Sequence, residues 1–291
     1  MSLKKRRKLV SILIITKIHE FHKLLASRKS NKKNSFSLFH TNIQSIHNKL
    51  DLLNLTLTNF GHLFDVLALS ETWIDQNDKK THIVGNLDGY NKFLSKHGNS
   101  LKGGCGFFVK TELQVLERNK LDISFTDSNN EYEAKWIEII NKGKKNIIIG
   151  VCYRHPRKKS DESFNQYLEK TLVQLNKKNK LTIVVGDFNY NLLNQEKDKY
   201  SAMFLNTMMN NNFQPCILEP TRITANNKPS LIDNIFLNTV EKDVHAGNFT
   251  TKLSDHLPQF MFIDDAMPIP TKKNRENGIY QNLPRVTTRM I

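Results

Sequence analysis

The chain contains few cysteines and no long apolar segment, and these two shortages exclude several classes of protein. Its 291 residues include three cysteines, Cys105, Cys152 and Cys216, which lie far apart and outside any Cys-x-x-Cys spacing. This pattern indicates neither a disulfide framework nor a cysteine-ligated zinc site, and a reducing compartment is the simpler expectation. No run approaches the roughly 18 to 20 apolar residues that cross a bilayer, so we expect no membrane partner.

Acidic residues are scarce relative to basic ones. The chain has 43 Lys and Arg against 28 Asp and Glu, which gives a formal net charge of +15. An excess of this size is typical of proteins that bind polyanions, and charge alone does not distinguish nucleic acid, an anionic membrane surface and an acidic protein. The hydrophobic content of 38% is sufficient for a core in one large domain or two small ones.

The two ends of the chain differ in composition from its middle. Residues 1–35 include the basic run 4–8, a short amphipathic stretch at 18–25 and a polar, basic end. We predict a basic, flexible N-terminal extension, and its basic run fits a nuclear-localisation signal or a solvated tail. The nucleus is the expected compartment, with the cytoplasm as the alternative. Residues 264–291 are predicted to be a polar C-terminal tail, which leaves 36–263 as the folded domain.

Short apolar and β-branched runs dominate this middle region. Nine of them predict strands, at 36–43, 65–72, 90–95, 106–110, 132–140, 146–153, 181–187, 231–237 and 257–263. Helices with one apolar face are predicted at 46–60, 164–175 and about 200–209. Because single helices separate the strands only in places, the pattern favours an α+β fold in which two mixed sheets form a sandwich with outer helices.

The strand predicted at 181–187 ends abruptly in polar residues. Asp187 and Asn189 have a spacing of two, which places their side chains on the same side of an extended backbone. One of them could then polarise a water molecule while the other donates a hydrogen bond to the group that this water attacks. A simple Asp-Phe-Asn turn is the alternative interpretation.

Other predicted strands also end near polar residues of catalytic type. The whole set consists of Asn42, Glu71, Tyr153 with Arg154, Asp187 with Asn189, Ser230 with Asp233, and Asp255 with His256. Carboxylate oxygens suit Mg²⁺, and the lack of a His/Cys cluster argues against zinc. His256 could bind a phosphoryl oxygen while Asp233 fixes its tautomer. Singly, Glu71 reads as a surface residue and His256 as a structural one, but the set favours metal-assisted phosphodiester cleavage.

These residues belong to motifs that occur in a recognisable order. The motifs are Ser70-Glu71-Thr72-Trp73, Lys102-Gly103-Gly104-Cys105-Gly106, Tyr153-Arg154-His155-Pro156, Gly186-Asp187-Phe188-Asn189, Glu219-Pro220-Thr221-Arg222, Asp233-Asn234-Ile235-Phe236 and Ser254-Asp255-His256. Over about residues 36–263 the chain resembles the endonuclease/exonuclease/phosphatase superfamily. In particular, it is similar to the apurinic-like endonuclease domain of LINE-type (non-LTR) retrotransposons.

The resemblance implies a four-layer α/β/β/α sandwich and a Mg²⁺-dependent DNA endonuclease, a hydrolase that nicks one strand and leaves a 3′-hydroxyl. Mn²⁺ is a possible substitute, DNA is the implied partner, and the chain is expected to be a monomer. By position, the implied metal ligands are Glu71, Asn42 and Asp255. The implied catalytic residues are Asp187 and Asn189 at the attacking water, His256 at the phosphate with Asp233 behind it, and Tyr153 near the phosphate or the leaving group. The implied DNA-binding or supporting residues are Arg154, Thr221, Arg222 and Ser230.

One residue departs from the pattern of the superfamily. Gln44 stands where many members have an Asp, two residues after the first-strand Asn. A second metal carboxylate is therefore missing, which weakens a two-metal mechanism and leaves Glu71 as the principal ligand.

Two other functions remain open. The chain could be a phosphatase or phosphodiesterase that acts on inositol phosphates, lipids or RNA ends, although the charge of +15 disfavours this. It could also be a catalytically silent copy that keeps the fold and binds nucleic acid or protein. The intact set from Asn42 to His256 favours an enzyme, encoded by a retroelement or by a gene derived from one.

Overall fold

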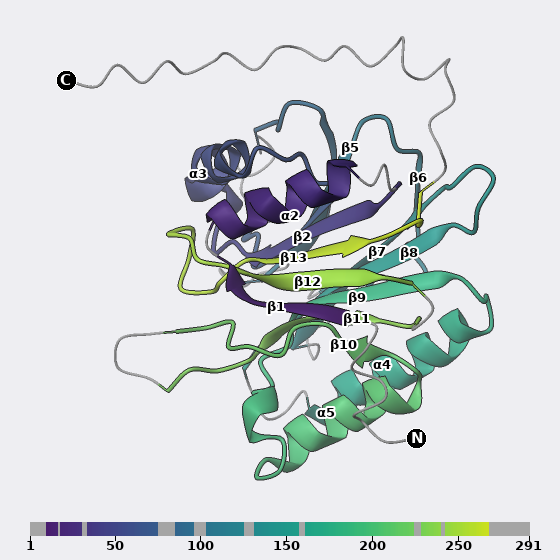
Figure 1. The fold of residues 1–291 in the computed structure, drawn as a ribbon. Helices are drawn as coiled ribbons and strands as arrows, with labels where there is room; N and C mark the ends of the chain where they lie inside the picture. The colour runs from purple at the N-terminus through teal and green to yellow at the C-terminus, as the bar shows by residue number, and fades with distance from the viewer. Residues whose placement is uncertain are drawn as a thin grey trace, which may run out of the picture.

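Two mixed β-sheets pack face to face in the computed structural model, which describes residues 10–16, 18–30, 34–74, 85–95, 103–124, 131–156, 161–223, 228–239 and 242–267 (Figure 1). The first sheet has the strand order β1 (Val10–Thr16), β12 (Val244–Phe249), β13 (Gln259–Ile263), β2 (Phe36–Asn42), β3 (Val66–Ser70), β5 (Cys105–Lys110) and β4 (Tyr90–Leu94). The second sheet has the order β10 (Gln214–Pro215), β11 (Asp233–Leu237), β9 (Leu181–Asp187), β8 (Ile147–Arg154), β7 (Tyr132–Ile139) and β6 (Val115–Glu117).

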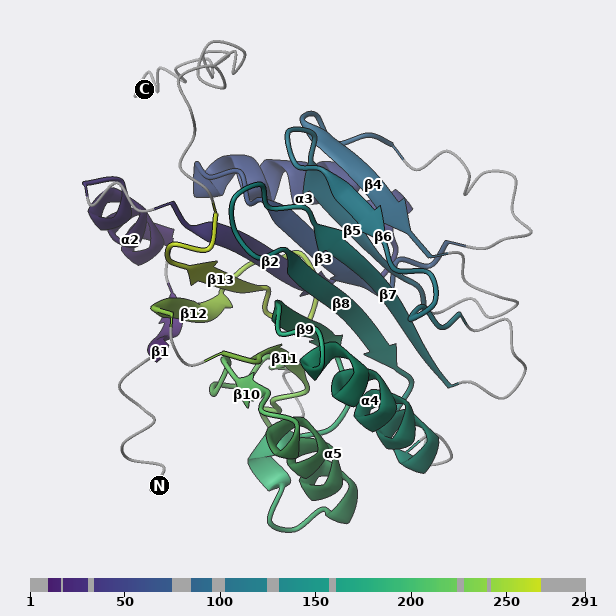
Figure 2. The same cartoon turned by 90° about the vertical axis from the view of Figure 1, so that its right-hand side faces the viewer.

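Helices cover the outer faces of both sheets. Figures 1 and 2 show α2 (Ile18–Ser30) and α3 (Ile46–Phe60) on one side, and α4 (Asp161–Asn176) and α5 (Lys199–Asn210) on the opposite side. One apolar core lies beneath α2 and α3, and a larger one fills the space between the sheets and continues under α4 and α5. The predicted four-layer α/β/β/α sandwich is therefore confirmed.

The local sequence patterns identified most of these elements. Each of the nine predicted strands is present with ends within two residues of the prediction, and the three predicted helices are present as α3, α4 and α5. The strands that were not predicted are β1, β6, β10 and β12. In β12, His245, Gly247 and Asn248 interrupt the apolar residues, so the segment lacks a clear two-residue period.

The N-terminal segment differs from the predicted flexible extension over residues 1–35. Strand β1 pairs in parallel with β12 at the edge of the first sheet, and α2 packs on that sheet. Phe21 of α2 is fully buried, with ring centroids 4.8 Å from Phe249 and 5.2 Å from Phe260. Arg28 pairs with Asp264, at the start of the predicted C-terminal tail. Burial of Phe21 and Leu25 thus outweighs the basic, polar composition of this segment.

Two parallel crossovers bring polar strand ends to one edge of the sandwich. Helix α3 connects the parallel strands β2 and β3, so that Asn42 lies in register with Ser70. Helix α4 connects the parallel strands β8 and β9, so that Tyr153 lies in register with Asp187. Parallel strands end at the same edge of a sheet, and each sheet therefore presents its polar ends there.

Candidate active site

Asn42 joins the polar ends of the two sheets. Its Nδ2 donates hydrogen bonds to Glu71 Oε1 at 2.8 Å and to Asp187 Oδ2 at 2.9 Å. Asn42 is fully buried, yet its Oδ1 accepts no hydrogen bond within the described part of the chain. A buried acceptor without a donor is costly, and a cation would satisfy it. An orphaned carbonyl oxygen next to two carboxylates therefore fits the oxygen ligand set that Mg²⁺ prefers.

Glu71 lies on a strained turn immediately after β3. Its φ of 54° falls in the left-handed region, as does the φ of 53° at Trp73, and Trp73 Nε1 donates to Glu71 Oε2 at 3.0 Å. Of the eight non-glycine residues with positive φ in the described ranges, five are Gln44, Ser45, Glu71, Trp73 and Asn189. Such strain persists only where the surroundings impose it, and it is concentrated here at the strand ends that carry the candidate site.

Asp187 lies at the end of β9, directly opposite Asp233 at the start of β11. Gly186 precedes it because a Cβ at this position would lie 1.8 Å from the carbonyl oxygen of Cys152 on β8. Burial, and then the charge of Asp233, raise the pKa of Asp187 to about 7. A carboxylate with this pKa is suited to accept a proton near neutral pH. The backbone N–H of Asn189 donates to Asp187 Oδ1 at 3.1 Å.

His256 forms a buried pair with Asp233. Its Nδ1 lies 2.9 Å from Asp233 Oδ2 and 3.1 Å from Oδ1. Burial lowers the pKa of His256, but the charge and the hydrogen bond of Asp233 outweigh it and raise the pKa to about 9. The ring is therefore an imidazolium at neutral pH. Asp187, Asp233 and His256 are all buried, and a ligand atom of each lies within 4.8 Å of the others.

Thr221 and Ser254 hold this pair in place. Thr221 is fully buried, and its Oγ1 accepts hydrogen bonds from the backbone N–H groups of Ile232 and Asp233 at 3.2 and 3.1 Å. Ser254 Oγ donates to the carbonyl oxygen of Asn42 at 2.8 Å and accepts from the N–H of His256 at 3.2 Å. Thr221 thus has a supporting position, and Ser254 links the His256 loop to the Asn42 strand.

Asp255 is engaged by protein donors. Its Oδ2 accepts from Arg222 Nε at 2.8 Å, and its Oδ1 accepts from Gln44 Nε2 at 2.7 Å. Partial burial raises the pKa of Asp255, but the hydrogen bond from Arg222 and the nearby positive charges bring it below its usual value. Both oxygens of Asp255, which the resemblance implied as a metal ligand, are therefore hydrogen-bonded to protein donors.

Arg154 is buried and cannot reach a nucleic acid from its position. Its guanidinium donates to the carbonyl oxygens of Phe188 at 2.7 Å and Asn189 at 2.8 Å, and it forms an ion pair with Asp161 at 2.9 Å. It also lies over the ring of Tyr190, 3.8 Å from the centroid. Arg154 therefore fastens the loop that follows β9, which is a supporting position.

The polar residues of the candidate site are bordered by Tyr153, Ser230 and Arg222. Burial, and then the charges of Glu71 and Asp187, raise the pKa of the Tyr153 phenol, so its hydroxyl stays protonated. Ser230 and Arg222 exchange two backbone hydrogen bonds of 3.0 Å at the base of a loop, and the side chain of Arg222 is 40% exposed. Arg222 is thus the member of the predicted DNA-side set whose charge reaches solvent, although Asp255 binds it.

Three further residues near the site lie outside the sequence motifs. His40 on β2 is fully buried, bonds to Gln259 and lies 3.2 Å from Ser70 Oγ, and burial lowers its pKa. Glu133 on β7 is fully buried and accepts from the N–H of Gly104. Lys49 Nζ lies 3.5 Å from Gln44 Oε1. For Glu133, the signal was an acidic residue inside a predicted buried strand.

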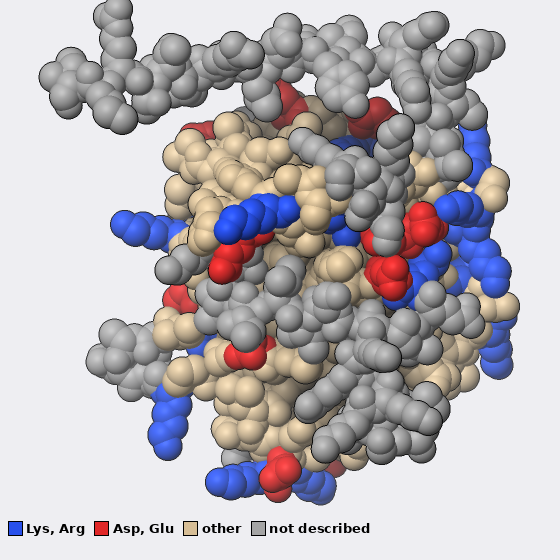
Figure 3. All heavy atoms as spheres, viewed as in Figure 1, with Lys and Arg blue, Asp and Glu red and all other residues tan. Residues whose placement is uncertain are grey.

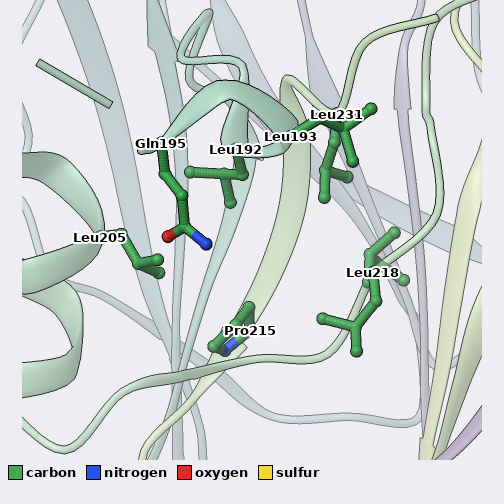
Figure 4. Close-up of a pocket in the computed structure, with 8 residues that line it drawn as sticks. Leu192, Leu193, Gln195, Leu205, Pro215, Leu218 and Leu231 are labelled. Atoms are coloured by element: carbon green, nitrogen blue, oxygen red, sulfur yellow. The ribbon is translucent and has the colours of Figure 1, made fainter. Parts of the chain in front are cut away.

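A separate apolar pocket of about 320 Å³ lies beside the loop after β9 (Figure 4). It is lined by Leu192, Leu193, Gln195, Leu205, Pro215, Ile217, Leu218 and Leu231. This lining includes none of the polar residues described above. Among the described residues, no helix combines the length and the apolar composition that crossing a membrane requires.

Several solved structures share this fold. The endonuclease domain of TRAS1, a telomere-specific non-LTR retrotransposon, is 17% identical with a TM-score of 0.58, and the match covers 79% of this chain and 98% of that one. The AP endonuclease LMAP from Leishmania major is 13% identical with a TM-score of 0.59, covering 91% and 96%. The mannosyl-6-phosphatase Bt3783 of Bacteroides thetaiotaomicron is 14% identical with a TM-score of 0.55, covering 78% and 98%. At these identities the likeness concerns the fold.

The family follows from the sequence itself. No curated protein matches the chain. The sequence signature of the Endonuclease/Exonuclease/phosphatase family, in contrast, matches residues 39–256, which contain every candidate site residue from Asn42 to His256. Its members are hydrolases that act on phosphodiesters or phosphate esters and generally use divalent metals. The chain therefore belongs to the Endonuclease/Exonuclease/phosphatase family.

Proposed function

We propose that this chain is a Mg²⁺-dependent DNA endonuclease of a non-LTR retroelement, or of a gene derived from one. It would hydrolyse one strand of duplex DNA and leave a 3′-hydroxyl. The observation that carries the proposal is the buried Asn42 side chain, which binds Glu71 and Asp187 through Nδ2 and leaves Oδ1 without a donor. This contact joins a candidate metal ligand on one sheet to a candidate base on the other.

Glu71 and Asn42 would hold the metal ion. Their oxygens are of the hard type that Mg²⁺ prefers, and Mn²⁺ would be accepted by the same set. When bound, the ion would supply positive charge that stabilises the negative charge developing on the scissile phosphate. Asp255 would contribute through its hydrogen bonds, because Arg222 and Gln44 occupy its oxygens.

The proton transfers would be divided between the remaining groups. Asp187 would accept a proton from the attacking water, whose oxygen forms the new bond to phosphorus, with the Asn189 loop holding Asp187 in place. The bond from phosphorus to the 3′-oxygen breaks, and this oxygen takes up a proton to become the 3′-hydroxyl. His256, as an imidazolium, would donate a hydrogen bond to a phosphoryl oxygen, and the neutral Tyr153 hydroxyl is a further donor near the phosphate.

Two cations beside the site would bind DNA phosphates. Arg222 is partly exposed and pairs with Asp255, and Lys49 lies close enough to Asp255 and Glu71 for their charges to act on it. On the face shown in Figure 3, Lys and Arg side chains of the described residues lie at several places, most densely along the right-hand edge, with Asp and Glu between some of them. We place the phosphate contacts at the site itself, because Arg222 and Lys49 lie there. Binding should weaken steeply as salt rises.

Nicking of a supercoiled plasmid tests this function. We expect nicking with Mg²⁺ or Mn²⁺, none with EDTA, and extension of the nicked ends by a DNA polymerase, because the ends carry a 3′-hydroxyl. Glu71→Gln should reduce nicking by at least about 100-fold without a change in thermal stability. Glu138→Gln is the matched control, since Glu138 is a buried acid in β7 that binds Arg118 and Lys180.

Four results would contradict the proposal. Undiminished nicking by Glu71→Gln would show that the reaction does not need Glu71. Nicking in EDTA would show that it does not need a metal ion. A purified wild-type chain that cleaves a phosphoinositide but not plasmid or abasic duplex would assign it to another phosphate ester, and inactivity on every substrate would indicate a silent copy.

We also propose that the chain is a monomer and acts in the nucleus, where a DNA substrate of this kind is found. The basic run 4–8 that motivates this location lies outside the described residues. Sedimentation at two concentrations tests the first point, because a dimer would sediment faster at the higher one. A fluorescent fusion with and without residues 1–9 tests the second, and exclusion of the full chain from the nucleus would refute it.

A further inference from the structure

The strained turn that carries Glu71 is held from outside by two glycines. The N–H of Thr72 donates to the carbonyl oxygen of Gly104 at 3.2 Å, and the N–H of Trp73 donates to that of Gly103 at 2.8 Å. On the other side, the carbonyl oxygen of Glu71 accepts from the N–H of Ser45 at 3.0 Å. The backbone around Glu71 is therefore clamped between the turn after β2 and the segment that leads into β5.

In the segment that leads into β5, only glycine fits at positions 103 and 104. Gly103 and Gly104 have φ values of 139° and 89°, which side chains rarely tolerate, and a Cβ at Gly104 would lie 2.3 Å from Thr72 Oγ1. Glycine has little conformational preference of its own, so a Gly-Gly segment does not hold a defined shape unless a neighbour fixes it. The conformation of the clamp must come from another element.

Glu133 supplies that fixed point. It is fully buried on β7 of the opposite sheet, and its carboxylate accepts the N–H of Gly104. On β8, Tyr153 is its direct partner in register, and the charges of Glu133, Glu71 and Asp187 all act on the Tyr153 phenol. Glu133 thus lies one residue from the candidate site, anchored in a strand that the larger core surrounds.

We infer that Glu133 is a positioning residue for the metal ligand Glu71, which it holds in the binding conformation through Gly104, Gly103 and the turn at residues 71–73. The inference rests on the proposed metal role of Glu71. The essential property of Glu133 is that its side chain is long enough to bring a carboxylate oxygen from β7 to the N–H of Gly104. A buried peptide N–H needs such an acceptor to stay in one orientation. Without this acceptor, the clamp loosens and Glu71 is no longer preorganised for the ion.

The fluorescence of Trp73 reports the conformation of Glu71 independently of catalysis. Its indole N–H donates to Glu71 Oε2, so binding of an ion by Glu71 changes the environment of the ring. The chain has two tryptophans, and the other, Trp136, is fully buried on β7 with its Nε1 bound to the Tyr167 hydroxyl at 2.7 Å. Tryptophan fluorescence titrated with Mg²⁺ therefore reports Glu71, and Trp73→Phe should abolish the response.

The test is a Mg²⁺ titration of the full chain and of four variants, followed by Trp73 fluorescence and by plasmid nicking. Glu133→Ala removes the acceptor, and Glu133→Asp withdraws it by about 1.5 Å, the length of one carbon–carbon bond, while keeping the charge. Glu133→Gln keeps both the reach and an acceptor oxygen. Glu138→Ala is the matched control, because it deletes an equally buried carboxylate from the far part of the same strand.

We expect the Mg²⁺ midpoint to rise at least about tenfold in Glu133→Ala and Glu133→Asp, and to stay within about threefold of wild type in Glu133→Gln and Glu138→Ala. Nicking at saturating Mg²⁺ should recover most of its rate in Glu133→Asp, because enough of the ion restores the conformation of Glu71. A merely structural role would lower thermal stability alike in Glu133→Ala and Glu138→Ala without moving either midpoint.

The inference is overturned if the folded Glu133→Asp protein has the wild-type midpoint, or if Glu138→Ala shifts the midpoint as much as Glu133→Ala does. If Glu133→Ala does not fold, the comparison of Glu133→Asp with Glu133→Gln decides alone. A wild-type chain whose Trp73 fluorescence ignores Mg²⁺ and which does not nick DNA would instead refute the proposed metal site. The two failures are therefore distinguishable.

Discussion

Replacement of Asp233 by asparagine should move the pH dependence of nicking toward acid. Asp233 contacts His256 Nδ1 at 2.9 Å and faces Asp187 across β9 and β11, so its charge acts on both groups. In the wild type, nicking needs Asp187 deprotonated to accept a proton and His256 protonated to donate a hydrogen bond. We therefore expect a bell-shaped profile: the acid limb reports Asp187, whose pKa of about 7 a bound Mg²⁺ lowers, and the alkaline limb reports His256, whose pKa is raised to about 9.

The size of the change follows from the loss of the Asp233 charge. The pKa of His256 should fall from about 9 toward its ordinary value of 6.5, because the charge of Asp233 is gone and only the charges of Asp187 and Asp255 still oppose burial. At pH 7.5 the imidazolium fraction would drop from nearly all of the protein to roughly one tenth, so the rate should fall about tenfold. The pKa of Asp187 should fall as well, since Asp233 is one of the causes that raise it. Both limbs thus move toward lower pH.

The assay is kcat/KM for plasmid nicking between pH 5 and pH 10 at constant ionic strength and saturating Mg²⁺. Asparagine has the shape of aspartate and its Oδ1 can still accept the Nδ1–H, so the ring should keep its orientation. Thermal unfolding of the variant controls for folding.

An unchanged alkaline limb in the folded Asp233→Asn protein would refute this reasoning. It would mean that His256 does not act as an imidazolium, or that Asp233 does not set its charge. A uniform loss of rate at every pH would lead to the same conclusion, because lost charge stabilisation alone predicts recovery at lower pH.

Three further predictions concern the fold and the binding of DNA. Gly186→Ala should destabilise the protein by about 3 kcal/mol or more in urea unfolding, because its Cβ would lie 1.8 Å from the Cys152 oxygen; a wild-type midpoint would refute this close approach. Phe21→Ala should cost about 3 to 5 kcal/mol, since Phe21 is fully buried, and a loss below about 1 kcal/mol would mean that α2 does not pack as described. Lys49→Met, in the inactive Glu71→Gln background, should reduce the slope of log affinity against log salt by about 0.9; an equal slope would show that Lys49 contacts no phosphate.

Local patterns predicted much of the fold and several of the polar residues that the structure brings together at the strand ends. Apolar strands that end in polar residues pointed to Asp187, Asn189 and the pair of Asp233 with His256, and the structure brings these residues together. This works because strand period, helix period and strand ends are properties of neighbouring residues. The amphipathic stretch at 18–25 was visible in the sequence, but its packing was not, because it depends on contacts of Phe21 and Leu25 with residues far along the chain, such as Phe249 and Phe260.

The role of an individual side chain could be assigned only from the residues that it contacts in the folded structure. Arg154 and Arg222 are both basic residues within motifs, yet Arg154 is buried against Asp161 while Arg222 reaches solvent beside Asp255. Nothing in the local sequence separates these two environments. Glu133 likewise belongs to no motif, and its contact with Gly104 joins β7 of one sheet to the segment that leads into β5 of the other.

The sequence by itself determined nine of the thirteen described strands, helices α3, α4 and α5, the family and the list of polar residues at strand ends, because each depends on residue type and on short-range spacing. Only the tertiary structure decided that Asn42 binds Glu71 and Asp187 together, that Asp255 is occupied by Arg222 and Gln44, and that the turn at Glu71 is strained. The physical reason is distance along the chain. Asn42 and Asp187 are separated by 145 positions, and their contact exists because two sheets pack with their polar ends at one edge.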